Sequence, residues 1–265
     1  MARSTFRVLT LNTLFRPRAR ERLRAIAPAL NAGGADFLCL QEVVYGANVR
    51  LLGQSLTDYP SCAFSPFGIW VTGGLVSFAR HKIDASSFEV FQKRGEWLSI
   101  GAADRLLRKG FLTSRLVVGG QKVAVINTHL LANYDQDWSP RNRFAMHEAA
   151  ELEQLGRAVI AMPEDTLVVV AGDLNVPVTS PMLGKFASQA GLRSVFEATA
   201  PSTYRQPGSN GPGLAIDHIL YRAPEGLVSK VSAGIQFDAA VEFPRGRTGF
   251  ASDHVAIEAE FTLDG

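Results

Sequence analysis

Short apolar runs recur along the whole chain, each bounded by glycine, aspartate or asparagine. They are rich in Val, Ile, Leu, Phe and Thr, and this combination of composition and boundaries is typical of β-strands. The runs predict strands at residues 6–11, 37–40, 75–78, 111–118, 123–127, 167–171, 216–221 and 254–261.

Three longer segments place apolar residues at three- and four-residue spacing, which predicts helices. They are residues 18–31, 140–162 and 181–190, and they end at Gly33-Gly34, Pro163 and Gly191. Because predicted strands and helices are mixed from end to end, we expect a layered α/β (α+β) fold. No linker, repeat or low-complexity tract divides the sequence, so we expect a single domain over residues 1–265.

The composition excludes two broad classes of protein. The 265 residues include 27 Lys or Arg and 25 Asp or Glu, for a formal net charge of +2, and 46% of them are apolar. The chain is therefore neither a charged disordered polymer nor a broadly basic nucleic-acid coat. Recognition of an anionic ligand would need a few placed residues, or a cation supplied from solution.

The cysteine content and the length of the apolar stretches indicate in which compartment the protein lies. Cys39 and Cys62 are too few for a disulfide scaffold, and the apolar neighbours of Cys39 predict a buried thiol. The N-terminal residues lack an apolar stretch of signal-peptide length, and no window approaches the ~20 apolar residues of a membrane span. On this basis we expect a cytoplasmic monomer.

Polar side chains mark the ends of the predicted strands. Five apolar segments carry them, with Asn12, Glu42, His129, Asp173 followed by Asn175, and Asp217, and Ser252-Asp253-His254 opens a further strand. Singly, each has a structural explanation: a turn for Asn12, a cap for Glu42, an Asx turn for Asp173, or a buried ring for His254. Their joint occurrence favours a functional site.

The residue types point to metal-assisted hydrolysis of a phosphate ester. Carboxylate and amide oxygens are the ligands that Mg²⁺ prefers, and Mg²⁺ is bound through one or two carboxylates and a substrate phosphate. The sequence contains no H-E-x-x-H segment and no paired cysteine motif, which disfavours a zinc site. Imidazoles nearby would suit acid and base catalysis near neutral pH.

The polar groups follow one another along the chain in this order: Asn12, Glu42, His129, Gly172-Asp173-Leu174-Asn175, Asp217 and Ser252-Asp253-His254. This order resembles the endonuclease/exonuclease/phosphatase superfamily, the DNase I-like metal-dependent phosphoesterases. The resemblance extends from Leu9 to Ile257. It implies a four-layer α/β/β/α sandwich of two mixed β-sheets. It also implies a site at one edge, where the loops at the strand ends converge.

Within the superfamily, the chain is most similar to the neutral sphingomyelinases. The similar segments are residues 127–134, with Thr128-His129-Leu130, Ala132 and Tyr134, then Glu151-Leu152 with Gln154, residues 74–81 (GLVSFARH) and residues 95–97 (GEW). Asn133 departs from the pattern, because the eukaryotic members tend to have Glu there. The absence of a C-terminal membrane span is a second departure.

The resemblance implies the metal ligands. Glu42 would be the principal ligand of Mg²⁺, with Asn12 beside it, and Asp253 would be a second ligand or would orient its neighbours. Mn²⁺ or another divalent cation is an alternative.

The resemblance also implies the groups that act on the substrate. Asp217 would orient His254, and either His254 or Asp173 would activate a water molecule for direct attack on phosphorus. Asn175 and His129 would contact the phosphate. His218 is expected to be structural, because it points to the opposite side of its strand from Asp217.

The substrate class stays open between three readings. The first is phospholipid headgroup release at a membrane surface. Residues 67–71 could then be an exposed apolar loop that docks on the lipid, although a buried strand edge is an equal alternative. Close to Asp253 in the sequence lie Phe243, Phe250, Arg245 and Arg247. The second is a nuclease, or a phosphatase of a soluble ester such as an inositol phosphate. Residues 16–24 are rich in arginine, but such a run is more typical of a solvated helix face than of a nucleic-acid site. The third is a non-catalytic binding module, which the number of polar motif residues disfavours.

Overall fold

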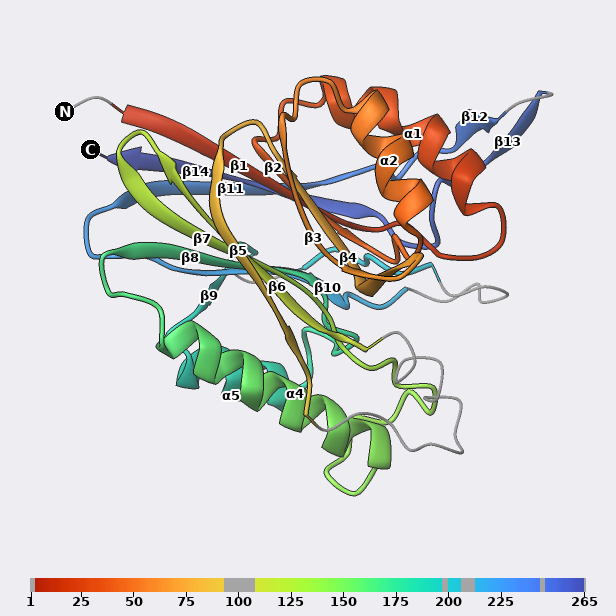
Figure 1. Ribbon diagram of the computed structural model, residues 1–265. Coiled ribbons are helices and arrows are strands. Elements are labelled where there is room, and N and C mark those ends of the chain that lie inside the picture. Colours follow the sequence, from red (N-terminus) through yellow and green to blue (C-terminus); the bar gives the residue numbers. More distant parts are fainter. Residues whose placement is uncertain (1–2, 93–107, 197–199, 206–212, 244–245, 265) are drawn as a thin grey trace.

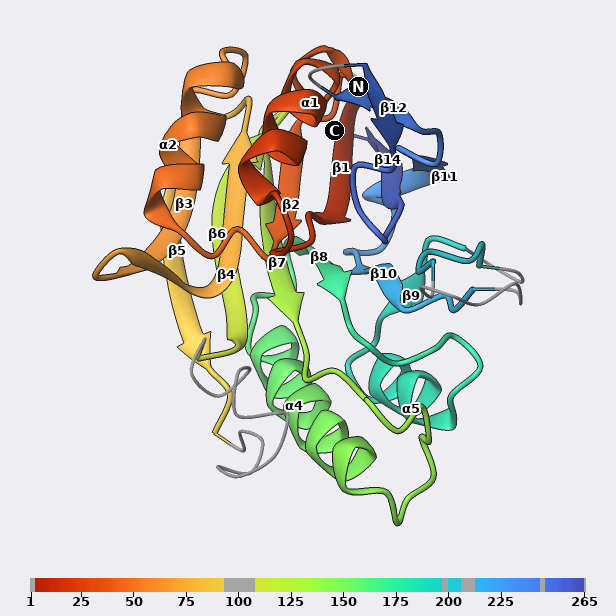
Figure 2. The ribbon, with the colours of Figure 1, turned by 90° about the vertical axis from the view of Figure 1, so that its right-hand side faces the viewer.

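Two six-stranded β-sheets pack face to face in this computed structural model, which describes residues 3–92, 108–196, 200–205, 213–243 and 246–264 (Figures 1 and 2). The strand order is β11-β14-β1-β2-β4-β3 in the first sheet and β5-β6-β7-β8-β10-β9 in the second. Both sheets are mixed, because β1 and β2 pair in parallel, as do β7 and β8, while the other neighbours pair antiparallel.

The strand bounds follow the apolar runs of the sequence. The first sheet contains β1 (Arg3–Asn12), β2 (Phe37–Gln41), β3 (Ser61–Phe67), β4 (Trp70–Ala79), β11 (Val228–Gln236) and β14 (Ala256–Asp264). The second contains β5 (Ile83–Val90), β6 (Gly110–Val118), β7 (Gln121–His129), β8 (Thr166–Asp173), β9 (Arg193–Ser194) and β10 (Asp217–Arg222). A short separate hairpin pairs β12 (Val241–Phe243) with β13 (Arg247–Gly249).

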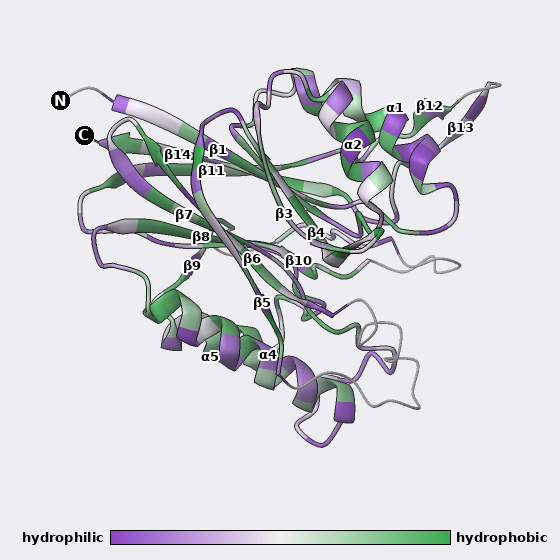
Figure 3. Cartoon of the chain, in the orientation of Figure 1, coloured by the Kyte–Doolittle hydropathy of each residue, from purple (hydrophilic) through white to green (hydrophobic). Residues whose placement is uncertain are grey.

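Helices cover the outer face of each sheet. The helices α1 (Ala19–Ala32) and α2 (Gly46–Ser55) lie on the first sheet, and α4 (Arg143–Ile160) and α5 (Pro181–Gln189) lie on the second (Figure 2). One apolar cluster fills the space between the sheets, and one lies beneath each pair of helices. Figure 3 shows hydrophilic and hydrophobic residues alternating along the helices, as expected of elements that bury one face. This arrangement confirms the predicted four-layer sandwich of two mixed sheets.

Burial on both faces explains why the central strands were predictable and the peripheral ones were not. Every residue of β8 is buried, so its sequence is a continuous apolar run. Strands β5 and β11 lie at sheet edges and are largely exposed, and their mixed composition gave no prediction. Helix α2, with a short and weakly apolar face, was also missed.

Three predicted boundaries need correction. The helix expected over 140–162 starts at Arg143, because the Asn142 side chain caps its first turn by accepting from Phe144 and Ala145 N–H groups. The strand expected over 254–261 starts at Ala256, since His254 instead forms a bridge with Tyr204. The sequence pattern predicts that Asp217 ends a strand, whereas it is the first residue of β10.

The fold brings the predicted residues to one edge. Strands β1, β2, β7 and β8 all run toward the same edge of the sandwich (Figure 2). Strand β10 runs antiparallel to β8 and so starts at that edge.

Candidate active site

The register of strand pairing places the polar strand ends beside one another. Asn12 is the last residue of β1, and Glu42 directly follows the parallel strand β2. In the second sheet, Asp173 at the end of β8 lies opposite His129 on one side and Asp217 on the other. The facing edges of the two sheets therefore form one polar site.

His254 and Asp217 form a hydrogen-bonded pair in this site. His254 Nδ1 lies 2.8 Å from Asp217 Oδ2, and His254 Nε2 lies 3.8 Å from Asp173 Oδ2. Ser252 holds the histidine in place, because its Oγ accepts from the His254 backbone N–H (3.1 Å) and donates to the Asn12 carbonyl (2.6 Å). Asp217 thus fixes one ring nitrogen, and the other is directed toward Asp173.

Asp173 connects the two sheets through its carboxylate. Its Oδ2 accepts from Asn12 Nδ2 at 3.0 Å and lies 3.4 Å from His129 Nε2. Its Oδ1 accepts from the Asn175 backbone N–H at 2.9 Å. This carboxylate is 1% exposed, so its position is fixed by these contacts.

Asn12 is oriented by a third set of hydrogen bonds. Its Nδ2 donates to Glu42 Oε1 at 3.1 Å as well as to Asp173, and its Oδ1 accepts from the Leu14 backbone N–H at 3.0 Å. The amide nitrogen therefore faces the two carboxylates. To bind a cation through Oδ1, the amide would have to turn by half a rotation.

Unusual backbone conformations orient the side chains of Glu42 and Asn175. Glu42 and Asn175 have positive φ angles of 62° and 52°, which are uncommon for residues other than glycine. The backbone beside Glu42 is held by a bond from the Val43 N–H to the Gly74 carbonyl at 2.9 Å. Asn175 Nδ2 donates to the Leu130 carbonyl at 3.0 Å. Strained residues held in this way are concentrated at functional sites.

Burial and charge give the two histidines different protonation states. Burial, with the nearby charges of Lys109 and His254, holds the pKa of His129 well below its usual value, so this ring is neutral. Burial also disfavours the charged form of His254, but the carboxylates of Asp217, Asp173 and Asp253 outweigh it and raise its pKa. Burial and the charge of Asp217 raise the pKa of Asp173.

A cavity of about 300 Å³ opens onto these groups. Its lining includes the predicted residues Asn12, Glu42, His129, Asp173, Asn175, Asp253 and His254. Asp217 does not line it and reaches the cavity only through His254. Sequence reasoning missed Lys109, a 4% exposed side chain whose Nζ donates to the Leu130 carbonyl, and Tyr204, whose ring centroid lies 4.9 Å from that of His254. Neither residue belongs to a motif that would have indicated it.

The donor atoms in the cavity fit a hard divalent cation. Glu42, Asp173 and Asp253 contribute carboxylates and Asn12 an amide, which are the oxygen ligands that Mg²⁺ prefers. Asp173, Asp217 and His254 form an alternative set, each with a potential ligand atom within 4.8 Å of the others. A cation at that set would compete with the bond between Asp217 and His254. The Glu42 side is free of this conflict.

Other residues singled out by the sequence have defined places. His218 is buried, with Nε2 2.8 Å from the Val176 carbonyl, in a structural environment. Residues 67–71 form the tip and start of the β3–β4 hairpin, where Phe67 and Ile69 are exposed and Val71 is buried. Arg247 pairs with Glu21. Arg245 and residues 95–97 lie outside the described residues. None of the described helices is long and apolar enough to cross a membrane.

The two-sheet sandwich defines the class of this protein: the chain belongs to the Endonuclease/Exonuclease/phosphatase family, whose family model matches residues 9–254. Proteins of this family are phosphoester hydrolases. A Drosophila melanogaster protein described as "Putative neutral sphingomyelinase" is 26% identical over an alignment of 275 residues. The alignment covers 97% of this chain. The chain spans 60% of the length of that relative.

Two solved structures share the fold at low identity. Beta toxin from Staphylococcus aureus, solved as an F277A, P278A mutant with bound magnesium ions, has a TM-score of 0.75 and 17% identity over 97% of this chain and 99% of that one. TDP2 from D. rerio, complexed with a single strand DNA product, has a TM-score of 0.72 and 18% identity over 99% of this chain and 100% of that one.

Proposed function

We propose that the chain is a Mg²⁺-dependent phosphodiesterase that releases the headgroup of a sphingomyelin-type phospholipid by direct attack of water on phosphorus. The observation that carries this proposal is a single cavity lined by His254, which Asp217 holds through Nδ1, by the buried Asp173 and by further carboxylate oxygens. Glu42, Asn12 and Asp253 would hold the cation. When bound, Mg²⁺ supplies positive charge that stabilises the phosphoryl oxygens in the transition state.

The protein's own groups position the reacting atoms. Asp217 holds the imidazole of His254, and Asp173 lies beside its other nitrogen. Because the surrounding carboxylates raise the pKa of His254 and keep its ring protonated, Asp173 takes the proton of the attacking water. Asn175 orients the phosphoryl group or the water. His129, kept neutral by burial, donates a hydrogen bond to the phosphate.

The lipid substrate rests on sequence similarity. The chain is similar over nearly its whole length to the protein described as "Putative neutral sphingomyelinase", although it is shorter than that protein. Hydrolysis of sphingomyelin at the phosphodiester bond next to ceramide would yield phosphocholine and ceramide. The near-neutral chain also suits a zwitterionic headgroup better than a long polyanion.

Hydrolysis of a nucleic-acid phosphodiester is the second candidate. It is favoured by the shared fold with TDP2, which was solved with a single strand DNA product, and by the arginines that follow Phe15, whose backbone N–H donates to the Glu42 carboxylate. The two candidates use the same cavity and differ in what lies outside it.

The test is a substrate panel run with Mg²⁺ and with EDTA. It measures phosphocholine release from sphingomyelin micelles, cleavage of a single-stranded oligonucleotide and hydrolysis of bis-p-nitrophenyl phosphate. We expect phosphocholine release that EDTA abolishes. Activity that resists EDTA would overturn the metal assignment, and cleavage of the oligonucleotide alone would replace the lipid by the nucleic acid.

Variants test the site itself. His254→Ala and Asp173→Asn should each lower turnover by a factor on the order of 10²–10⁴, the usual scale for acid and base groups. Glu42→Gln should mainly raise the Mg²⁺ concentration required. His81→Ala is the matched control, because His81 lies outside the cavity and its side chain contacts Asp36. A folded His254→Ala variant with near-normal turnover would refute the proposed site.

A further inference from the structure

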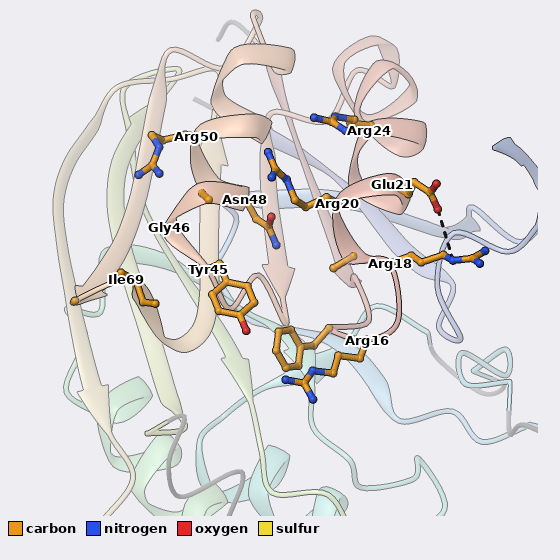
Figure 4. Close-up of a pocket in the computed structure, with 14 residues that line it drawn as sticks. Arg16, Arg18, Arg20, Glu21, Arg24, Tyr45, Gly46, Asn48, Arg50 and Ile69 are labelled. Carbon is orange, nitrogen blue, oxygen red and sulfur yellow. Dashed lines mark ion pairs between the residues drawn. The ribbon is translucent and has the colours of Figure 1, made fainter. Parts of the chain in front are cut away.

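A second concave surface lies beside the catalytic cavity, between the first turns of α1 and α2 (Figure 4). This groove has a volume of about 790 Å³. Among the described residues, its lining has one acidic side chain, Glu21, and five arginines: Arg16, Arg18, Arg20, Arg24 and Arg50. We refer to it as the arginine groove.

The charge of the arginine groove is poorly compensated. Glu21 is already engaged, because its carboxylate accepts from Arg247 at 2.8 and 2.9 Å and lies 3.9 Å from Arg18. Arg20, Arg24 and Arg50 are exposed, and none of them forms an ion pair within the described part of the chain. A groove lined by charges of one sign attracts an anion.

A buried polar group at the groove has no protein partner. Asn48 is 2% exposed and lines the groove, yet its Oδ1 forms no hydrogen bond with any described residue. Figure 4 shows Asn48 on α2, on the side that faces Arg20 of α1. A buried carbonyl oxygen without a donor costs free energy, so a ligand that brings an O–H or N–H group would relieve it.

Exposed apolar side chains form one rim of the groove. Ile69, at the tip of the β3–β4 hairpin, lines the groove and is 71% exposed, and the nearby Phe67 is 50% exposed with Arg108 over its ring at 5.1 Å. Arginines next to exposed apolar residues are typical of surfaces that dock on anionic lipid, where the cations meet headgroups and the apolar groups enter the bilayer interface.

The aromatic residues of the groove favour lipid over nucleic acid. Tyr45 packs against both Phe15 and Trp70, at centroid distances of 5.5 and 4.7 Å, and Arg16 lies over the Phe15 ring at 4.9 Å. Grooves for single-stranded nucleic acid offer free aromatic faces for base stacking. Here those faces are occupied by other side chains.

We propose that the arginine groove binds the headgroup of an anionic phospholipid and so holds the catalytic cavity at a membrane surface. The two sites are linked through Phe15, which lines the groove and whose backbone N–H donates to the Glu42 carboxylate. This proposal rests on the proposed lipid phosphodiesterase activity. It adds a second lipid, which is bound and not hydrolysed, beside the substrate.

The test is vesicle binding by the full chain in EDTA, where no turnover is needed. Wild type is sedimented with vesicles of phosphatidylcholine alone and with vesicles that also contain phosphatidylserine. We expect binding to the anionic vesicles only. The variant Arg20→Gln/Arg24→Gln/Arg50→Gln should lose about fivefold in affinity per arginine, or roughly 100-fold in all.

A matched variant controls for overall charge. Lys185→Gln/Arg193→Gln/Lys230→Gln removes three exposed cations from α5, β9 and β11, outside the groove, and should bind like wild type. Both triple variants should hydrolyse bis-p-nitrophenyl phosphate at the wild-type rate, since none of the six residues lines the catalytic cavity. Ile69→Ser should weaken vesicle binding without affecting this hydrolysis.

Three results would overturn the proposal. Wild type could bind both vesicle types equally, or both triple variants could lose the same affinity for anionic vesicles. An oligonucleotide could also bind through the three groove arginines more tightly than the anionic vesicles do. Failure of the lipid phosphodiesterase assignment is a separate outcome. It would appear as the absence of phosphocholine release from vesicles that the protein binds.

Discussion

The buried carboxyl group of Glu148 makes a sharp prediction about stability. Glu148 lies on α4 and is 0% exposed. Asn133 donates to its Oε2 at 3.2 Å, while its Oε1 has no hydrogen-bond partner among the described residues. Burial, with a further contribution from the charge of Glu151, raises the pKa of Glu148 to about 9. The folded protein therefore keeps this group protonated at neutral pH.

The sign and size of the effect follow from the two pKa values. The unfolded chain releases the proton near pH 4.5, whereas the folded chain keeps it to about pH 9. The stabilisation is fully present below the unfolded value, and it is lost as pH rises through this window at ~1.4 kcal/mol per unit. Between about pH 5 and about pH 8, this carboxyl alone should lower the free energy of unfolding by up to about 4 kcal/mol.

Replacing Glu148 by Gln should remove this slope. The amide keeps the size of the side chain and an acceptor for Asn133, and it does not titrate. Urea denaturation of wild type and Glu148→Gln at about pH 5 and about pH 8 measures the difference. We expect similar stabilities at the lower pH and a variant that is more stable by about 2–4 kcal/mol at the higher pH.

The control lies on the same helix. Glu153→Gln changes an exposed glutamate that pairs with Arg157, and it should follow wild type at both pH values. If the free energies of wild type and Glu148→Gln changed in parallel with pH, the burial argument would be refuted.

Two further predictions concern the site. Gly172→Ala should lower the free energy of unfolding by several kcal/mol, or prevent folding, because the added Cβ would lie 1.9 Å from the Thr128 carbonyl oxygen. Gly184→Ala, with no atom within 4 Å of its added Cβ, should be tolerated, and thermal melts compare the two variants. Asp217→Asn should lower the pKa of His254 and reduce turnover on bis-p-nitrophenyl phosphate on the order of 10²–10⁴-fold. An unchanged pH–rate profile for this variant would contradict the assigned pairing.

The sequence predicted the parts of the fold where local pattern and burial agree. The central strands β2 and β8 are buried along their whole length, so continuous apolar runs identify them. The polar residue that ends such a run stands out for the same reason, as Asp173 does at the end of β8. The layer order came from the resemblance and not from the pattern itself.

The missed features depend on contacts that no local pattern records. Lys109 becomes a cavity residue only because β6 and β7 pair and place it beside the Leu130 carbonyl. From the sequence alone, the arginines of residues 16–24 are predicted to lie on a solvated helix face. Only the packing of α1 beside α2 adds Arg50 and Asn48 and turns that face into a groove.

The small net charge of the chain conceals two regions of opposite sign. The catalytic site gathers Glu42, Asp173, Asp217 and Asp253, whose negative charge would repel a phosphodiester unless a divalent cation lay between them. The arginine groove carries positive charge on long side chains, none of which lines that cavity. The arginines therefore cannot replace the cation at the scissile phosphate. A protein that needed only to bind a phosphodiester would place its arginines in the cavity, whereas this separation suits an enzyme that uses metal for chemistry and arginine for attachment.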